Sequence, residues 1–199
     1  MILPIIAYGN PVLRKVGDDI PEDYPKLKEL VANMFETMYN AKGVGLAGPQ
    51  VGLSLRIFVA DTVQILQDVT EDNDFAGEKG IKKVFINAEI VEESGDEWMY
   101  DEGCLSIPNI QEGVSREETV RIQYYDEDFN FYDETYSGFT ARVIQHEYDH
   151  IEGILFTDYL SPLKKRMMKR KLEKISKGDV EVSYRMKFNV SRGKKKRKK

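Results

Sequence analysis

The sequence of 199 residues contains only one Cys and two His, and it has no long apolar run. A single Cys cannot form an intramolecular disulfide, and because a lone thiol is safest in a reducing compartment, we expect a cytoplasmic protein. No window approaches the roughly 18 consecutive apolar residues of a membrane span, and the first residues lack the pattern of a secretory signal. These absences exclude a disulfide-stapled fold and a site built from several histidines, and they predict no contact with membranes.

The net charge of -5 conceals two parts of opposite sign. Residues 163–199 contain 17 Lys and Arg but only three acidic residues, for a charge of +14, whereas residues 1–162 carry -19. A basic segment attracts phosphate backbones through counterion release without reading a base sequence. The ribosome is therefore a candidate partner and specific DNA is not, although a solvated helix face followed by a frayed tail accounts for the charge equally well.

The composition is sufficient for one hydrophobic core. Apolar residues make up 41% and aromatic residues 11% of the chain, and a single domain usually has about 100–200 residues. We therefore expect one compact domain over residues 1–190. Residues 191–199 are basic and contain no apolar side chain to bury, so we expect a disordered tail there.

Three helices are predicted from apolar spacing and from helix-start signals. Residues 25–41 show the i, i+3, i+4, i+7 spacing of an amphipathic helix. Ser161 and Pro162 suit the cap and first turn of a basic helix that ends near Gly178. Thr140 is a candidate N-cap for a helix that runs through both histidines.

Short β-type runs lie between these helices without a regular βαβ order. This pattern favours an α+β fold in which mostly antiparallel strands surround the helix that carries the histidines. A polar, acidic stretch over residues 68–80 indicates a surface loop. The predicted strands occupy residues 55–60, 83–87, 120–125, 131–136 and 180–188.

Both histidines belong to one pattern, H-E-x-x-H. On a helix, His146 and His150 leave the same face and can hold one metal ion. Glu147 follows the first histidine, where its carboxylate can act as a general base toward water without binding the metal. Isolated H-E-x-x-H strings occur by chance on amphipathic helices, but this one uses every histidine in the chain.

Two histidines do not complete a catalytic metal site, which needs three protein ligands and an open position. The third ligand must be a thiolate or a carboxylate. Cys104 follows Glu102 and Gly103, which make a poor core strand, so a metal-bound thiolate is favoured over a buried, inert Cys. A carboxylate such as Glu173, in the basic helix, would instead indicate a metalloprotease.

A glycine-rich segment at residues 43–50 reads G-V-G-L-A-G-P-Q. Its glycines allow a backbone to approach a ligand closely, and Gln50 offers an uncharged amide donor. The segment lacks Gly-Lys-Ser/Thr and follows a helix rather than a strand, which excludes a nucleotide loop. Taken alone, it could equally be a turn that ends a helix.

Residues 43–50, 102–106 and 145–150 together resemble, in order and spacing, the three motifs of the peptide deformylases. The resemblance extends over most of residues 1–165 and has one departure, Gly48, where the family usually has Ala. Losing one methyl group there is not expected to abolish function. The resemblance implies removal of the N-terminal formyl group from formyl-methionine of nascent polypeptides, with release of formate.

The resemblance also implies a role for each motif residue. Glu147 would take a proton from the attacking water and deliver it to the leaving amine. Donors to the oxyanion would be the Gln50 side chain and the Leu105 backbone N–H. The other implied roles are metal binding by Cys104, His146 and His150, substrate binding by Gly45 (as an added strand) and Gly103, and orientation of a ligand histidine by Glu102.

The family is usually described with one Fe²⁺, and Zn²⁺, Ni²⁺ or Co²⁺ can occupy such a site. The sequence alone leaves two other functional classes open. One is the metalloprotease with a downstream carboxylate ligand. The other is a non-catalytic module that binds the ribosome or RNA through its basic C-terminal segment.

Overall fold

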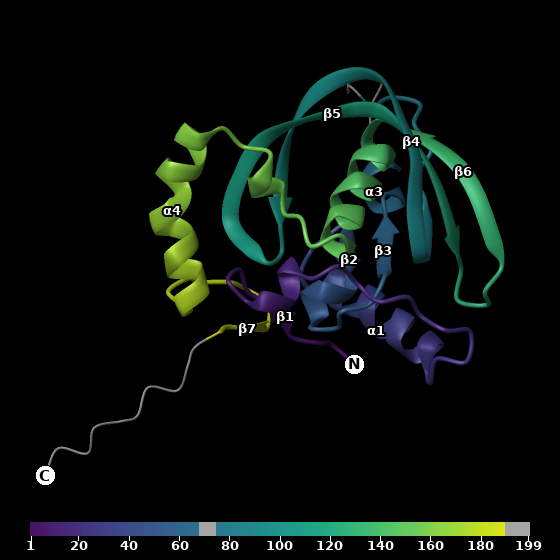
Figure 1. Ribbon diagram of the computed structural model, residues 1–199, viewed down its shortest axis with the longest axis horizontal. Coiled ribbons are helices and arrows are strands. Elements are labelled where there is room, and N and C mark those ends of the chain that lie inside the picture. The colour runs from purple at the N-terminus through teal and green to yellow at the C-terminus, as the bar shows by residue number, and fades with distance from the viewer. Residues whose placement is uncertain (68–74, 190–199) are drawn as a thin grey trace, which may run out of the picture.

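The computed structural model describes residues 1–67 and 75–189, which form a five-stranded antiparallel sheet and a two-stranded parallel sheet with helices on both faces of the larger one (Figure 1). The strand order is β2-β3-β4-β5-β6 in the large sheet and β1-β7 in the small one. The strands are β1 (Ile5–Ile6), β2 (Gly45–Ala47), β3 (Ile57–Asp61), β4 (Lys82–Cys104), β5 (Ile107–Tyr125), β6 (Phe131–Ser137) and β7 (Met186–Lys187). The helices are α1 (Leu27–Asn40), α2 (Val63–Leu66), α3 (Gly138–Ile151) and α4 (Pro162–Lys177), with 3₁₀ helices η1 (Pro11–Arg14), η2 (Gly48–Val51) and η3 (Phe156–Asp158). This is the α+β fold that the sequence predicts.

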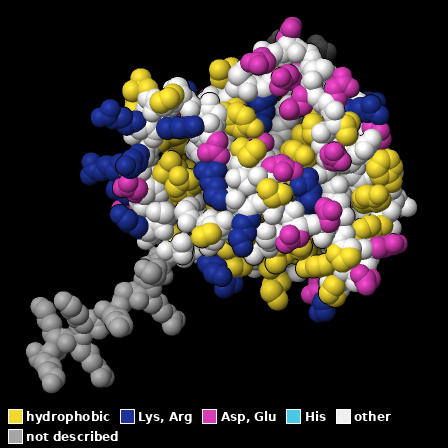
Figure 2. Space-filling view, in the orientation of Figure 1, with side chains coloured by type: hydrophobic (Ala, Val, Ile, Leu, Met, Phe, Trp, Pro, Cys, Tyr) yellow, Lys and Arg dark blue, Asp and Glu magenta, His cyan; other side chains and the backbone are white. Residues whose placement is uncertain are grey.

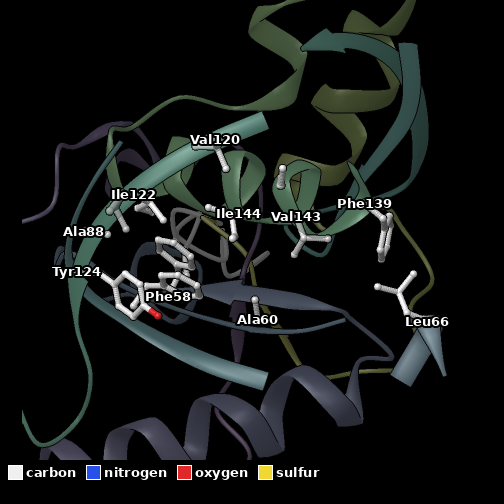
Figure 3. Packing of buried hydrophobic residues seen from close by; sticks show 14 residues of the cluster. Phe58, Ala60, Leu66, Ala88, Val120, Ile122, Tyr124, Phe139, Val143 and Ile144 are labelled. Carbon is white, nitrogen blue, oxygen red and sulfur yellow. The ribbon is translucent and has the colours of Figure 1, made fainter. Parts of the chain in front are cut away.

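The strand β3 is buried on both faces, because α3 covers one face of the large sheet and α1 the other. Phe58 and Ala60 face Val143 and Ile144 of α3 (Figure 3). The alternate β3 residues belong to the cluster under α1, whose members include Ile57, Val59, Val31, Met34 and Met38. Each large apolar side chain that is fully buried contributes about 1.5–3 kcal/mol. This packing fixes α3, and with it both histidines, against the sheet.

The strands β4 and β5 form one long hairpin that arches over α3 (Figure 1). They have 23 and 19 residues, so the short strands predicted over residues 83–87 and 120–125 are too short. Residues 91–97 are exposed throughout, and no apolar alternation marks them as a strand. The strand continues through these residues because their backbone pairs with β5, although register shifts interrupt the pairing. No hydrophobic pattern in the sequence reports this pairing.

The helix α3 begins at Gly138, and the N-cap predicted at Thr140 is wrong. Ser137 takes the N-cap position, but its side chain makes no capping hydrogen bond. The backbone N–H of Phe139 instead donates to both carboxylate oxygens of Glu78, at 3.0 and 3.2 Å. A carboxylate from a distant segment therefore satisfies a free donor of the first turn, which local sequence signals could not indicate.

The C-terminal helix α4 begins and ends as predicted. Ser161 Oγ accepts a hydrogen bond from the Lys164 N–H at 3.3 Å, and Gly178, with φ of 80°, follows the last turn. Lys and Arg side chains gather over this helix (Figure 2). The strand predicted over residues 180–188 is reduced to β7, because its parallel partner β1 has only two residues.

The predicted helix over residues 25–41 is observed as α1. Part of the loop predicted at 68–80, and the whole tail predicted at 191–199, lie outside the described residues. Within residues 1–67 and 75–189, no helix is long and apolar enough to cross a membrane.

Candidate metal centre and active-site cleft

Three side chains converge at the end of the β4–β5 hairpin. His146 and His150 lie one turn apart on α3, and Cys104 is the last residue of β4. Their ligand atoms all lie within 4.8 Å of one another, and Cys104 Sγ is 3.3 Å from His150 Nε2. No other group of three such side chains occurs in the part of the chain that the structure describes. The structure thus brings together the three residues that the sequence analysis names as metal ligands.

The donor set fits one divalent transition metal. A thiolate and two imidazoles are ligands that Zn²⁺ and Fe²⁺ accept. His146 Nδ1 is 2.8 Å from Glu102 Oε2, so its Nε2 remains for the metal. Burial and the neighbouring His146 lower the pKa of His150, which favours the neutral imidazole that a metal requires. The proposed alternative ligand, Glu173, is exposed on α4 and lies outside this group.

Glu102 lies at the centre of a buried ion network that holds His146. Arg116 donates to both of its carboxylate oxygens, at 2.7 and 3.1 Å, and Arg142 donates at 3.0 Å. Arg116 also pairs with Asp149 of α3 at 2.8 Å. Burial alone would raise the pKa of Glu102, but hydrogen bonds with His146 and Arg116 hold it well below its ordinary value. The carboxylate is therefore ionised and can orient the histidine.

The carboxylate of Glu147 is buried beside the metal ligands. It has 4% of its surface exposed, and its Oε2 has no hydrogen-bond partner among the described residues. Burial raises the pKa of Glu147 to about 7. A Cβ at Gly45 would come within 2.6 Å of Glu147 Cγ, so the glycine leaves the space that this side chain occupies. A carboxyl group with a pKa near neutrality can both accept and donate a proton.

Two candidate hydrogen-bond donors flank the metal ligands. Gln50 Oε1 accepts from the Ala47 N–H at 2.7 Å, and this fixes the amide with its Nε2 3.5 Å from Cys104 Sγ. Leu105 begins the two-residue turn between β4 and β5. Gly103 lies just before the turn and pairs with Gln111.

A cleft of about 810 Å³ runs along these groups. Its walls are the edge strand β2, the end of the β4–β5 hairpin, the inner face of α3 and residues 181–184. Glu147, Gln50 and Cys104 all line it. A peptide lying in the cleft would pass the metal ligands with one side against the edge of the large sheet.

Sequence reasoning missed the residues that act through tertiary contacts. Arg116 and Arg142 lie outside the three motifs, and Asp149 lies within residues 145–150 but has no role assigned from the sequence. Each is a charged residue at an inward-facing position. A buried charge in an otherwise regular strand or helix could have marked them as partners of another buried charge. Tyr184 was also missed, because it lies 34 residues beyond the last predicted ligand, His150.

The departure at Gly48 has a steric reason in this structure. A Cβ at this position would meet Leu55 O at 2.9 Å and Ile57 Cγ2 at 3.0 Å. The glycine therefore permits a close approach between η2 and the start of β3, two residues before Gln50.

Comparisons with known proteins agree with the site. The sequence model for polypeptide deformylase matches residues 2–166. A peptide deformylase from Christiangramia forsetii is 59% identical over 191 residues, covering 94% of this chain and 96% of that protein. Another from Flavobacterium johnsoniae is 57% identical over 196 residues, with coverages of 96% and 98%.

Solved structures show the same architecture. A peptide deformylase from Legionella pneumophila has a TM-score of 0.75 and 38% identity, covering 90% of this chain and 98% of that one. The enzyme from Thermus thermophilus has a TM-score of 0.77 and 36% identity, with coverages of 89% and 99%. The fold, the site and these similarities together show that the chain belongs to the polypeptide deformylase family.

Proposed function

We propose that this chain removes the formyl group from formyl-methionyl polypeptides and that Glu147 is the general base of the reaction. Family membership makes the chain an enzyme with deformylase function. The observation that supports the assignment of roles is the position of Glu147, whose carboxylate is buried beside the ligand group and has an oxygen without a hydrogen-bond partner in the described residues.

Cys104, His146 and His150 would hold one divalent ion, for which Fe²⁺ is our expectation and Zn²⁺, Ni²⁺ or Co²⁺ are alternatives. When bound, such an ion supplies Lewis-acid polarisation and lowers the pKa of water. Glu102 orients His146 through its 2.8 Å hydrogen bond and does not itself touch the substrate in this proposal.

The remaining groups act on the formyl carbon and the oxygen attached to it. Glu147 takes a proton from the attacking water and transfers it to the amine as the C–N bond breaks, so that formate and a free N-terminus leave. Gln50 Nε2 and the Leu105 N–H donate to the oxyanion of the tetrahedral intermediate. Loss of one such donor typically lowers turnover by about 10²–10³-fold.

The substrate backbone would pair with β2 as an added strand. This strand is at the edge of the large sheet, where it pairs with β3 alone among the described strands. Backbone groups of Gly45 would bond the peptide from this side, while Gly103, near the turn, contacts it from the other.

A pair of variants tests the proposal. Glu147→Ala should retain the metal and lose about 10²–10⁴-fold in formate release, because only the proton transfer is removed. Cys104→Ala should lose metal in elemental analysis as well as activity. Substantial turnover in metal-loaded Glu147→Ala, measured on a formyl-Met peptide, would contradict the general-base role.

The ribosome is the proposed partner of the basic C-terminal segment, and the cytoplasm the proposed location. The helix α4 carries Lys and Arg over its exposed face and has Glu173 as its one acidic residue. A protein that acts on emerging chains gains from attraction to ribosomal RNA, which is a dense array of phosphates.

A further inference from the structure

We infer that Tyr184 is a positioning residue for the reaction, because it fixes the turn that carries the Leu105 N–H. The inference rests on the proposed function, in which this N–H donates to the oxyanion. Tyr184 lies beyond residues 2–166, which match the family, and before the basic tail.

The turn between β4 and β5 is held from outside the hairpin at both of its carbonyl groups. The Tyr184 hydroxyl donates to Leu105 O at 2.7 Å, and the Tyr8 N–H donates to Ser106 O at 2.9 Å. A two-residue turn that follows a register shift at Gly103 has few contacts of its own to define its conformation. These two hydrogen bonds set the direction of the peptide groups on either side of Ser106. The first of these groups shares the Leu105 Cα with the peptide group that carries the Leu105 N–H, so fixing the Leu105 carbonyl restricts the rotation of that N–H.

Tyr184 is itself held on both sides along the chain. On one side, Asn109 Nδ2 donates to Glu181 O at 3.2 Å. On the other, β7 pairs with β1, and the Ile5 N–H donates to Arg185 O at 2.9 Å. The hydroxyl is therefore presented by an anchored segment, residues 181–187, that passes the turn end of the hairpin.

The same segment lines the cleft, and Tyr184 lies there beside the β4–β5 turn. Its ring also packs in the cluster that contains Leu105. The chain after α4 thus completes one wall of the cleft and braces the residue next to the metal ligand Cys104. Removing the hydroxyl leaves the ring packing in place and frees only the Leu105 carbonyl.

The expected effect is on the transition state. An oxyanion donor acts only when its N–H is aimed at the position that the developing charge will occupy. A small loss of alignment therefore lowers kcat more than it raises KM. This separates positioning from a structural role, which would lower the melting temperature, and from a binding role, which would raise KM.

The test compares Tyr184→Phe with the metal-loaded wild type. The variant should show about a tenfold lower kcat for formate release, KM within about twofold, and unchanged metal content. Tyr132→Phe is the matched control, because it removes a tyrosine hydroxyl that bonds Asp126 at 3.1 Å on the far strand β6. A kcat for Tyr184→Phe within twofold of wild type would overturn the inference.

A double variant shows whether Tyr184 acts through Leu105. Leu105→Pro removes the N–H at the first residue of the turn, and adding Tyr184→Phe should then cost less than about twofold. If the two losses in kcat are fully additive, Tyr184 does not act through the Leu105 N–H. If Leu105→Pro does not fold, the kcat of the single variant Tyr184→Phe decides the question. If the metal-loaded wild type releases no formate, the proposed function fails; if only the Tyr184 comparison fails, that function stands.

Discussion

Gly45 and Glu147 are in contact where β2 passes α3, and the contact depends on the absence of a side chain at residue 45. The Cβ of an alanine there would overlap the Glu147 carboxyl group, whereas the backbone of Gly45 is not in the left-handed region. The requirement for glycine is therefore one of space.

We predict that Gly45→Ala lowers formate release at least about 10²-fold while the metal is retained, because the base is displaced and the edge of β2 shifts. Gly113→Ala is a suitable control, since the two atoms nearest to its Cβ belong to the exposed side chain of Met99, which can turn aside into solvent. Kinetics and elemental analysis on both variants make the comparison. Wild-type turnover in Gly45→Ala would show that the carboxylate does not need this space.

Among individual residues, the sequence predicted those that a short motif or a unique residue type identifies. His146, Glu147 and His150 belong to one helical pattern, and Cys104 is the only thiol. Arg116 and Tyr184 could not be found in this way. Their roles come from partners 14 and 79 residues away along the chain, Glu102 and Leu105, and only folding brings these groups together.

At the scale of elements, α3 depends on a cap that comes from outside its own sequence. The Glu78 carboxylate accepts hydrogen bonds from the Phe139 N–H in the first turn. Gly138, with φ of 61°, lies so close to Glu78 that a Cβ at this position would overlap the carboxylate. Burial raises the pKa of Glu78 despite these hydrogen bonds. The desolvation of the carboxylate therefore offsets part of the stability that the cap gives to α3.

We predict that Glu78→Ala lowers the free energy of unfolding by about 1 kcal/mol, which is the usual cost of losing an N-terminal cap. Glu78→Gln should restore most of it, because the amide oxygen still accepts and the neutral group is easier to bury. Denaturant unfolding of the metal-free and metal-loaded proteins measures both values. Equal stability of Glu78→Ala and wild type would show that the contact contributes nothing to α3.

The length of β4 and β5 could not be predicted from the sequence, and the reason is related. A strand can be recognised when one face is buried, as in β3, but residues 91–97 have no buried face. The helix α4 was predictable because Ser161, Pro162 and Gly178 mark its ends locally. Elements defined by caps and apolar spacing were therefore found, and those defined by backbone pairing were not.

For the whole molecule, the charge asymmetry separates the candidate site from the basic segment that we propose contacts the ribosome. The proposed catalytic groups lie within the acidic residues 1–162. The basic residues 163–199 include nearly all of α4, which packs through Met168, Leu172 and Ile175 and turns its Lys and Arg outward (Figure 2). Because α4 leads into the segment that bears Tyr184, deleting everything after Pro162 would damage the cleft as well as the charge. A test of the ribosome contact must therefore leave residues 163–189 intact.

We predict that deleting residues 193–199, which removes six Lys and Arg, weakens co-sedimentation with ribosomes at low salt and leaves formate release from a short peptide unchanged. A variant of equal length with Ser at those six positions separates charge from chain length and should behave like the deletion. The difference from wild type should shrink as salt rises, because the attraction comes from released counterions. Co-sedimentation that stays at the wild-type level in both variants at low salt would contradict a contribution of residues 193–199 to the contact.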